Sequence, residues 1–346
     1  LDSRITFTRS TTGTFVGSNG LIQSAAINVP RFDYNPATLS PRGLLIEEQR
    51  TNLIIRSEEF NNSTWAKDLI TANSNVATAP SGTTTADKLI PDAAADLTNI
   101  AQGTTRIGAT YTANTTHTFS VFAKEAEFDR IQLYFSEGTG TTHRAQVTFS
   151  LVDGSVVTAA AVGGLFTNPS STSTYFGNGW YRFTLTFTTY TGDSGRARIA
   201  VKDSGTSTGD GTSGILIWGA QVEEGAFATS YIPTVASTVT RAADDASMTG
   251  TNFSSWYNQS EGTVVVSADS SRGGVAGTTR NFLFVDGTAS NIIRSNGTNP
   301  LQVIDASVTQ ASIAGLPLIP FDGTVYKFAS AFKVNDFATV TTGAVV

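Results

Sequence analysis

The 346-residue chain contains no cysteine. It therefore forms no disulfide, carries no thiol nucleophile and cannot build a zinc site from sulfur ligands. Histidine is almost as scarce, with only His117 and His143. Neither has a third candidate ligand near it in the sequence, so we expect neither a histidine metal site nor a proton relay.

Charged residues are also scarce. Only 14% of the residues are charged, against a usual share of about a quarter. The 22 basic and 28 acidic side chains give a net charge of −6 and a pI near 5.0. No run approaches the roughly 20 apolar residues of a membrane span. With no basic cluster in the sequence, we expect neither nucleic-acid binding nor membrane insertion.

The chain is rich instead in residues that favour strands and turns, among them 32 glycines, 21 phenylalanines and many threonines. Trp180–Phe187 alternates apolar and polar residues with period two, as a half-buried strand does. Short segments of this kind, separated by turn residues, predict an all-β fold with a jelly-roll β-sandwich over residues 66–235. The strands expected there are Ala86–Leu89, Thr118–Ala123, Arg130–Phe135, Gln146–Leu151, Trp180–Phe187, Arg196–Val201 and Ile215–Gln221.

Two parts of this sandwich do not have the pattern of strands. Asn168–Ser173 is a polar cluster that predicts a connection, and Ala159–Gly164 predicts a loop over one face. Residues 1–65 hold short strand candidates and three prolines close to apolar residues, which indicates an extended N-terminal arm lying over another surface. Residues 236–252 are expected to form a linker.

Residues 253–346 form a second β-region, with strands expected at Gly262–Ala268, Asn281–Val285, Asn291–Arg294, Leu301–Ile304 and Val325–Val334. A closed sandwich needs more strands than this region offers. We therefore expect the natural polypeptide to continue beyond residue 346.

Three blocks of sequence carry a resemblance to a known family. The first runs from Pro30-Arg31-Phe32-Asp33-Tyr34-Asn35-Pro36 through Arg42-Gly43-Leu44-Leu45-Ile46-Glu47-Glu48 to Ser57-Glu58-Glu59-Phe60. The second is Gly179-Trp180-Tyr181-Arg182, and the third joins Trp218–Gly225, Thr229–Thr234 and Thr240–Asp244. Together, in this order, they resemble tail-fibre, tailspike and other fibrous virion proteins of tailed bacteriophages over residues 1–250.

The resemblance implies a virion appendage on the tail or the head that meets a glycan of the host surface. It also implies a homotrimer in contact with other virion proteins. The central sandwich looks like a carbohydrate-binding jelly roll. Residues 253–346 are similar to part of a concanavalin A-like lectin domain through Tyr326–Asp336.

The sequence predicts no enzymatic activity. Adjacent acids such as Glu58-Glu59 point to opposite faces of a strand, so they are not the two carboxylates that flank a sugar in a glycosidase. The internal period of a long β-helix is also absent. Two alternatives stay open: a purely structural capsid or head fibre, and the binding portion of a polysaccharide-degrading tailspike.

A sugar-binding site combines an aromatic ring that stacks on the pyranose with polar groups that hold its hydroxyls. Trp180 and Trp218 are expected to pack in the sandwich or under the arm instead. The aromatic candidates are Trp65, Tyr134, Tyr175, Trp256 and Tyr257, and the arginine candidate is Arg294; Arg130, Arg144 and Asp286 are further candidates for polar contacts.

Acidic side chains suggest one cofactor, a structural calcium ion of the kind that jelly-roll sugar binders often carry. Asp87, Asp203, Asp210 and Glu223 are its candidate ligands; as an alternative, they cap turns. In the arm, Arg42, Glu47, Glu48 and Arg50 are expected to form ion pairs at subunit contacts or between arm and sandwich.

Overall fold

The computed structural model describes residues 1–97, 104–137, 142–190, 194–258 and 260–269, together with six later strands. The chain divides into two compact units, one of Leu1 and Thr6–Ala246, the other of Asp2–Ile5 and Ser247–Val346. The fold is all-β, as the sequence predicts, and the one helix of the described chain is α1 (Thr251–Ser254). No described helix has the length and apolar character needed to cross a bilayer.

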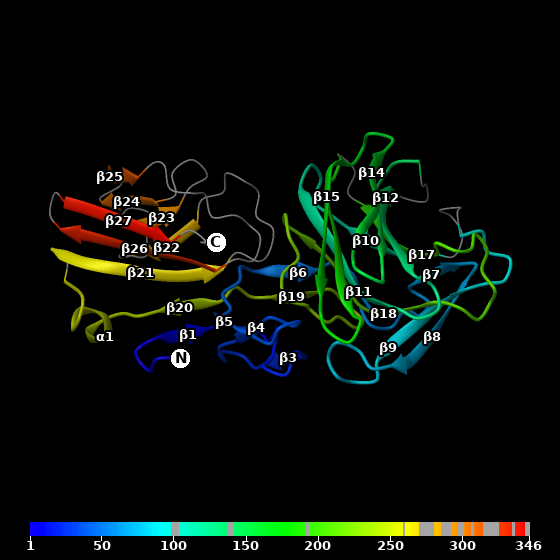
Figure 1. Ribbon diagram of the computed structural model, residues 1–346, viewed down its shortest axis with the longest axis horizontal. Helices are drawn as coiled ribbons and strands as arrows, with labels where there is room; N and C mark the ends of the chain where they lie inside the picture. The colour runs from blue at the N-terminus through cyan, green and yellow to red at the C-terminus, as the bar shows by residue number, and fades with distance from the viewer. Residues whose placement is uncertain are drawn as a thin grey trace. The chain divides into compact units, whose positions relative to one another are not determined.

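The first unit contains a β-sandwich of two six-stranded antiparallel sheets (Figure 1). One sheet has the order β14-β13-β12-β17-β10-β7, and we call it the arginine sheet. The other has the order β15-β16-β11-β18-β9-β8, and we call it the arm-side sheet. The strands of the arginine sheet are β14 (Val156–Val162), β13 (Arg144–Ser150), β12 (Arg130–Glu137), β17 (Ser194–Lys202), β10 (Thr104–Thr110) and β7 (Ala66–Asp68). Those of the arm-side sheet are β15 (Thr167–Tyr175), β16 (Tyr181–Thr188), β11 (Thr116–Glu125), β18 (Ile215–Glu224), β9 (Ala86–Pro91) and β8 (Ile70–Ala77).

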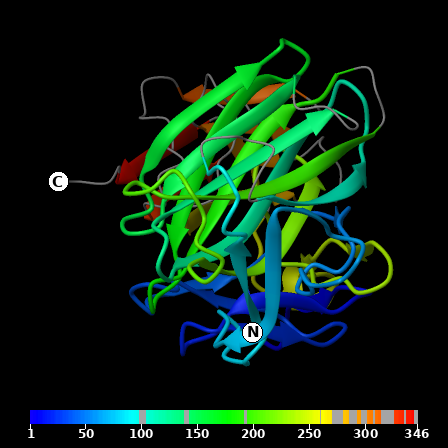
Figure 2. The ribbon, with the colours of Figure 1, turned by 90° about the vertical axis from the view of Figure 1, so that its right-hand side faces the viewer.

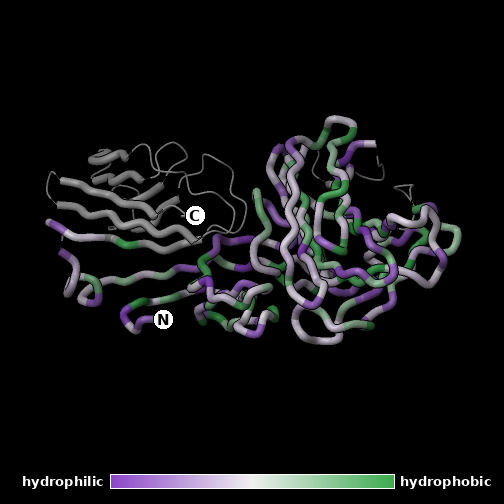
Figure 3. The backbone as a smooth tube through the Cα atoms, in the orientation of Figure 1, coloured by the Kyte–Doolittle hydropathy of each residue, from purple (hydrophilic) through white to green (hydrophobic). Residues whose placement is uncertain are grey.

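The core lies between the two sheets and follows from alternation along the strands. In β12, Ile131, Leu133 and Phe135 point into the core, while the even-numbered residues point outward. Figure 3 shows that hydrophobic and hydrophilic stretches are mixed along the strands of the sandwich. Stacked rings fill the centre, with Phe135 and Phe187 4.7 Å apart between centroids.

The seven sandwich strands expected from the sequence are all present, but two neighbouring predictions are wrong. Ala159–Gly164 is not a loop, because most of it belongs to β14, and Asn168–Ser173 lies within β15. Both are edge strands with one pairing neighbour and mostly exposed side chains. Without a buried face they need no apolar alternation, so their sequences resemble loops.

The arm consists of short strands that pair with one another and with residues after the sandwich (Figure 2). The hairpins are β2 with β3 and β4 with β5, while β6 pairs with β19 and β1 with β20. Their bounds are β1 (Thr6–Thr8), β2 (Gly13–Val16), β3 (Ile22–Ala25), β4 (Phe32–Tyr34), β5 (Pro41–Leu44), β6 (Arg50–Asn52), β19 (Val239–Arg241) and β20 (Asp245–Ser247).

A second core forms where the arm meets the outer face of the arm-side sheet. Phe122, Trp180, Trp218 and Tyr231 pack there with Ala79 and Ala86, and Ile22 of the arm packs against them. This confirms that Trp180 and Trp218 are packing residues. A bulge at Gly219 keeps Trp218 pointing outward; its φ of +63° suits glycine, and a Cβ there would lie 3.0 Å from the Phe122 ring.

The second unit is described mainly by its strands. One sheet has the order β21-β26-β27, and a second is the meander β22-β23-β24-β25. Their bounds are β21 (Glu261–Asp269), β22 (Arg280–Phe284), β23 (Ile292–Ser295), β24 (Leu301–Asp305), β25 (Val308–Ile313), β26 (Val325–Lys333) and β27 (Asp336–Thr342). The five strands named from the sequence are present, together with β25 and β27.

Candidate functional site

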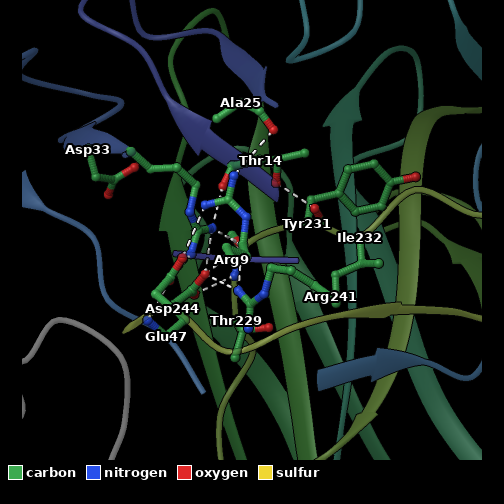
Figure 4. Close-up of polar contacts among 12 residues, drawn as sticks. Arg9, Thr14, Ala25, Asp33, Glu47, Thr229, Tyr231, Ile232, Arg241 and Asp244 are labelled. Atoms are coloured by element: carbon green, nitrogen blue, oxygen red, sulfur yellow. Dashed lines mark hydrogen bonds and ion pairs between the residues drawn. The ribbon is translucent and has the colours of Figure 1, made fainter. Parts of the chain in front are cut away.

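The arm is locked onto the sandwich by a buried cluster of charged side chains (Figure 4). The carboxylate of Asp244 pairs with Arg9 at 3.1 Å and with Arg31, and all three side chains are fully buried. Glu47 pairs with Arg31 at 2.8 Å and with Arg241. Three arginines therefore surround two carboxylates in a space without bulk water.

Hydrogen bonds to the backbone also hold this cluster, although Nε of Arg31 and Nε of Arg241 have no hydrogen-bond partner among the described residues. Glu47 accepts from the backbone N–H of Ser230 at 2.8 Å, and Asp244 accepts from the backbone N–H of Glu47 at 2.8 Å. Arg9 donates to the carbonyl of Ala26 at 2.8 Å. The cluster joins the arm to the residues that follow β18. Because its charged groups pair with one another, its role is structural.

The arm residues named from the sequence lie in the same region. Glu47 pairs with Arg31 and Arg241 of its own chain. Arg42 lies 4.0 Å from Asp33. Glu48 pairs with Arg50, whose Nε lies 3.8 Å from the buried carboxylate of Glu223. The Arg50–Glu223 contact joins the arm to the sandwich, whereas the Arg42–Asp33 and Glu48–Arg50 contacts lie within the arm.

The outer face of the arginine sheet has a different composition. Arg106, Arg144, Arg196 and Arg198 lie on it, and we call it the arginine face. Strand register places three rows of residues across it. These rows are Arg106-Arg198-Tyr134-Gln146, Gly108-Arg196-Ser136-Arg144 and Thr104-Ala200-Gln132-Thr148, each read from β10 through β17 and β12 to β13.

Hydrogen bonds hold several of these side chains in place. Arg198 donates from Nε to the Ser136 hydroxyl at 2.9 Å, and its guanidinium lies 5.6 Å from the centre of the Tyr134 ring. Arg144 donates from Nε to Oε1 of Gln146 at 2.7 Å. These contacts fix the orientation of the two guanidinium groups.

A buried acceptor also points outward here. Gln132 donates from Nε2 to the Thr148 hydroxyl at 3.0 Å, while its Oε1 has no hydrogen-bond partner among the described residues. An unpaired buried acceptor is costly, so this oxygen is suited to a ligand hydroxyl.

The face is accessible next to Arg196. Gly108 is exposed, and a Cβ built on it would meet no atom within 4 Å. Arg106, Arg144, Arg196 and Gln146 are half-buried. A ligand can therefore reach the face beside Arg196, whereas Arg198 is only 3% exposed.

The positive charges of the arginines on this face also repel one another. Burial lowers the pKa of Arg106, and the positive charges of Arg198 and Arg196 lower it further. The pKa of Arg198 is lowered by burial and by Arg196, against the opposing effect of Tyr134. Asp68 pairs with Arg106, but no described acidic side chain pairs with Arg196. The face therefore has an excess of positive charge.

One lysine at the end of this face gives a prediction about stability. Burial lowers the pKa of Lys202 to about 8, and its ammonium donates to the carbonyl of Leu97. Between pH 8 and the ordinary lysine pKa, the unfolded chain binds more protons than the folded one, so stability rises with pH. After allowance for solvent screening, this rise should be about 1–2 kcal/mol.

Lys202→Met should remove that rise, because methionine does not titrate. Urea unfolding of both proteins at pH 7.5, 9 and 10.5 measures it as a difference, which cancels the other groups that titrate in this window. Parallel curves for the two proteins would show that Lys202 keeps an ordinary pKa in the folded state.

The structure corrects several of the aromatic predictions. Trp65 is 1% exposed, and its ring packs on Phe60 at 4.8 Å, so it belongs to the core. Tyr134 lies on the arginine face but is fully buried beside Arg198, which leaves no ring surface for stacking on a sugar. Tyr175 remains 41% exposed beside Tyr181 at the edge of the arm-side sheet.

The other predicted sugar contacts lie in the second unit. Trp256 is 55% exposed, and the Tyr257 ring stacks on Phe253 at 4.5 Å. The side chain of Arg294, in β23, and the whole of Asp286 lie outside the described residues.

The predicted calcium ligands do not converge. Asp203 and Asp210 cap turns, accepting from the backbone N–H of Gly205 at 2.8 Å and of Thr212 at 2.8 Å. Asp87 accepts from the backbone of Phe60 and Asn75, and Glu223 from Thr229 and Gln221. In the described part of the chain, no three acidic or histidine side chains gather closely enough to hold a metal ion.

Sequence reasoning missed Arg106, Arg196, Arg198, Gln132 and Gln146 as members of one face. A signal was present, since Arg196 and Arg198 are two residues apart in an expected strand and must share a face. The pairing of β17 with β12 and β10 was the missing information, because it sets Arg198 beside Tyr134 and Arg106.

Comparisons with known proteins give little further guidance. No family model and no curated protein matches the chain. A similar solved structure is the enzymatically active domain of tailspike protein 4 of bacteriophage CBA120, with 13% identity and a TM-score of 0.28. The match covers 50% of this chain and 21% of the tailspike chain. A TM-score this low assigns neither a fold nor residue roles.

One expectation is corrected at this point. The sequence predicted a protein without enzymatic activity, whereas the similar tailspike structure is described as enzymatically active. We therefore withdraw the prediction that this chain has no enzymatic activity.

Proposed function

We propose that the protein is a subunit of a tailed-phage fibre or spike that binds a host surface polysaccharide on the arginine face. The resemblance of residues 1–250 to fibrous virion proteins supports the setting. The proposal includes a homotrimer that contacts other virion proteins.

One observation carries the binding role, namely the difference between the two outer faces of the sandwich. The arm covers the arm-side sheet with a second apolar core and a buried ionic cluster. The opposite face bears guanidinium, amide and hydroxyl groups beside accessible Gly108 and the unpaired oxygen of Gln132. Such converging polar groups fix the hydroxyls of a sugar.

The test is a binding screen of the purified protein on immobilised bacterial surface polysaccharides, with and without calcium. Gly108→Trp should abolish the retention that the wild-type protein shows, because the indole covers the accessible part of the face without entering the core. The matched control is Thr71→Trp, which alters an exposed threonine of β8 on the other sheet.

The two variants separate the possible outcomes. Retention that survives Gly108→Trp would place the binding site elsewhere and contradict the proposal. A folded oligomer that no polysaccharide retains would favour a purely structural fibre module.

A further inference from the structure

Tyr175 is an exposed aromatic residue at one edge of the sandwich. It ends β15, the edge strand of the arm-side sheet, and it is 41% exposed. Strand register sets it directly opposite Tyr181 of β16, and the centroids of the two rings lie 5.0 Å apart. The Tyr175 ring therefore packs on a neighbouring ring while a large part of it stays open to solvent.

A series of rings anchors Tyr175 to the core. The Tyr181 ring stacks on Phe183 at 5.6 Å, and Phe183 lies 4.6 Å from Phe149, both of them fully buried. The Tyr175 hydroxyl also accepts from the backbone N–H of Gly179 at 3.3 Å. A ring that is already held in place loses little conformational entropy when a ligand stacks on it.

The hairpin between β13 and β14 brings a carboxylate to the same edge. A Cβ built on Gly154 would lie 2.6 Å from the Tyr181 ring, so this hairpin packs closely on the ring. Burial raises the pKa of Tyr181, and the nearby Tyr175 and Asp153 raise it further. The two tyrosines and the carboxylate of Asp153 therefore lie close together.

Asp153 itself is exposed and ionised. The backbone N–H and the hydroxyl of Ser155 donate to its Oδ1 at 3.0 and 2.7 Å. These hydrogen bonds are the main reason why the pKa of Asp153 is lowered to about 2. A carboxylate can accept about four hydrogen bonds, so this one keeps capacity for the hydroxyls of a ligand. Ser173, two residues before Tyr175 on the same side of β15, is exposed as well.

These groups suit a neutral sugar. The apolar face of a hexose can stack on an open aromatic ring while polar groups beside the ring fix the hydroxyls. An ionised carboxylate accepts from two adjacent hydroxyls but repels a negatively charged substituent. The net charge of −6 acts in the same direction. The chemistry at Tyr175 and Asp153 therefore favours neutral hexoses over uronic or sialic acids.

We propose that the tyrosine edge, formed by Tyr175, Tyr181 and Asp153, binds a neutral hexose unit of a saccharide. The hexose stacks on Tyr175, and two adjacent hydroxyls donate to Asp153. The site lies outside the arginine face and goes beyond the function proposed above. With one open ring it binds weakly by itself, and it adds contacts to a polysaccharide that the arginine face already holds.

The experiment titrates neutral hexamers of glucose, mannose and galactose into the full chain with ring-labelled tyrosine, followed by NMR. At least one hexamer should bind and shift the ring signals of Tyr175 and Tyr181. The hexamer of the corresponding uronic acid should bind about fivefold more weakly, because its carboxylates are repelled by Asp153.

Matched variants locate the effect. Tyr175→Ala should weaken binding of the best hexamer about tenfold, whereas Tyr175→Phe, which keeps the ring, should stay within about threefold of the wild-type protein. Asp153→Asn should weaken binding about tenfold and remove the discrimination against the uronic acid hexamer. The control is Phe32→Ala in the arm, because Phe32 is also 41% exposed and should leave binding unchanged.

The outcomes distinguish this inference from the proposed function. Failure of every neutral hexamer to bind would overturn the inference, whereas the polysaccharide screen decides the proposed function separately. Hexamer binding that Gly108→Trp removes and Tyr175→Ala leaves intact would overturn the tyrosine edge and support the arginine face. Dissociation of an oligomer by Tyr175→Ala, measured by sedimentation, would make Tyr175 a contact between copies of the chain and would also overturn the inference.

Discussion

Replacing Asp244 by alanine should lower the free energy of unfolding by about 3–5 kcal/mol, the usual result of removing one partner from a buried ion pair. The Asp244 carboxylate is fully buried, pairs with Arg9 and Arg31, and accepts from the backbone N–H of Glu47. Without it, two buried guanidinium groups lose a counterion. The arm should then separate from the sandwich at lower urea concentrations, which tryptophan fluorescence measures.

The control for this prediction is Asp245→Ala at the next position, where the residue is exposed. Its effect should stay within about 0.5 kcal/mol. Asp244→Asn keeps the size of the side chain but removes the charge, so it should be nearly as harmful as Asp244→Ala. A loss below about 1 kcal/mol for both variants would mean that the cluster does not hold the arm.

Trp218→Ala should cost about 3–5 kcal/mol of stability through loss of the second core. The Trp218 ring lies 4.6 Å from Tyr231 and 5.3 Å from Phe122, and its indole N–H donates to the Thr85 hydroxyl at 3.1 Å. The deletion leaves a cavity between the arm and its sheet. Urea unfolding followed by circular dichroism measures the change, since this variant loses a fluorophore.

Trp256→Ala provides the comparison, because that indole is 55% exposed and should contribute within about 0.5 kcal/mol. Equal effects of the two substitutions would contradict a second core centred on Trp218. Trp218→Ala should also raise the susceptibility of the arm to proteases, because the arm loses its apolar contact.

The central strands were predictable because burial leaves a clear periodic pattern. Trp180–Phe187 alternates, and the structure places β16 there between two neighbours. The edge strands β14 and β15 were not predictable, since Ala159–Gly164 and Asn168–Ser173 have little to bury. Propensity and alternation therefore identify a strand only where packing imposes a face on it.

The site was less predictable than the fold. An exposed aromatic ring was the expected feature, yet Tyr134 proved to be buried beside Arg198. Single residues such as Arg106 and Arg198 carry no signal by themselves. They become neighbours only through the register of β10 with β17, which depends on contacts between residues about 90 positions apart.

The most direct test of saccharide binding on the arginine face observes the arginine side chains themselves. In arginine-labelled protein, Nε–Hε NMR signals are assigned by single substitutions and followed during titration with a fragment of the polysaccharide that the protein retains. We expect the signals of Arg106, Arg144, Arg196 and Arg198 to shift together, while those of the buried Arg9 and Arg31 stay in place. Binding with no change in the signals of Arg196 and Arg198 would contradict a binding site on the arginine face.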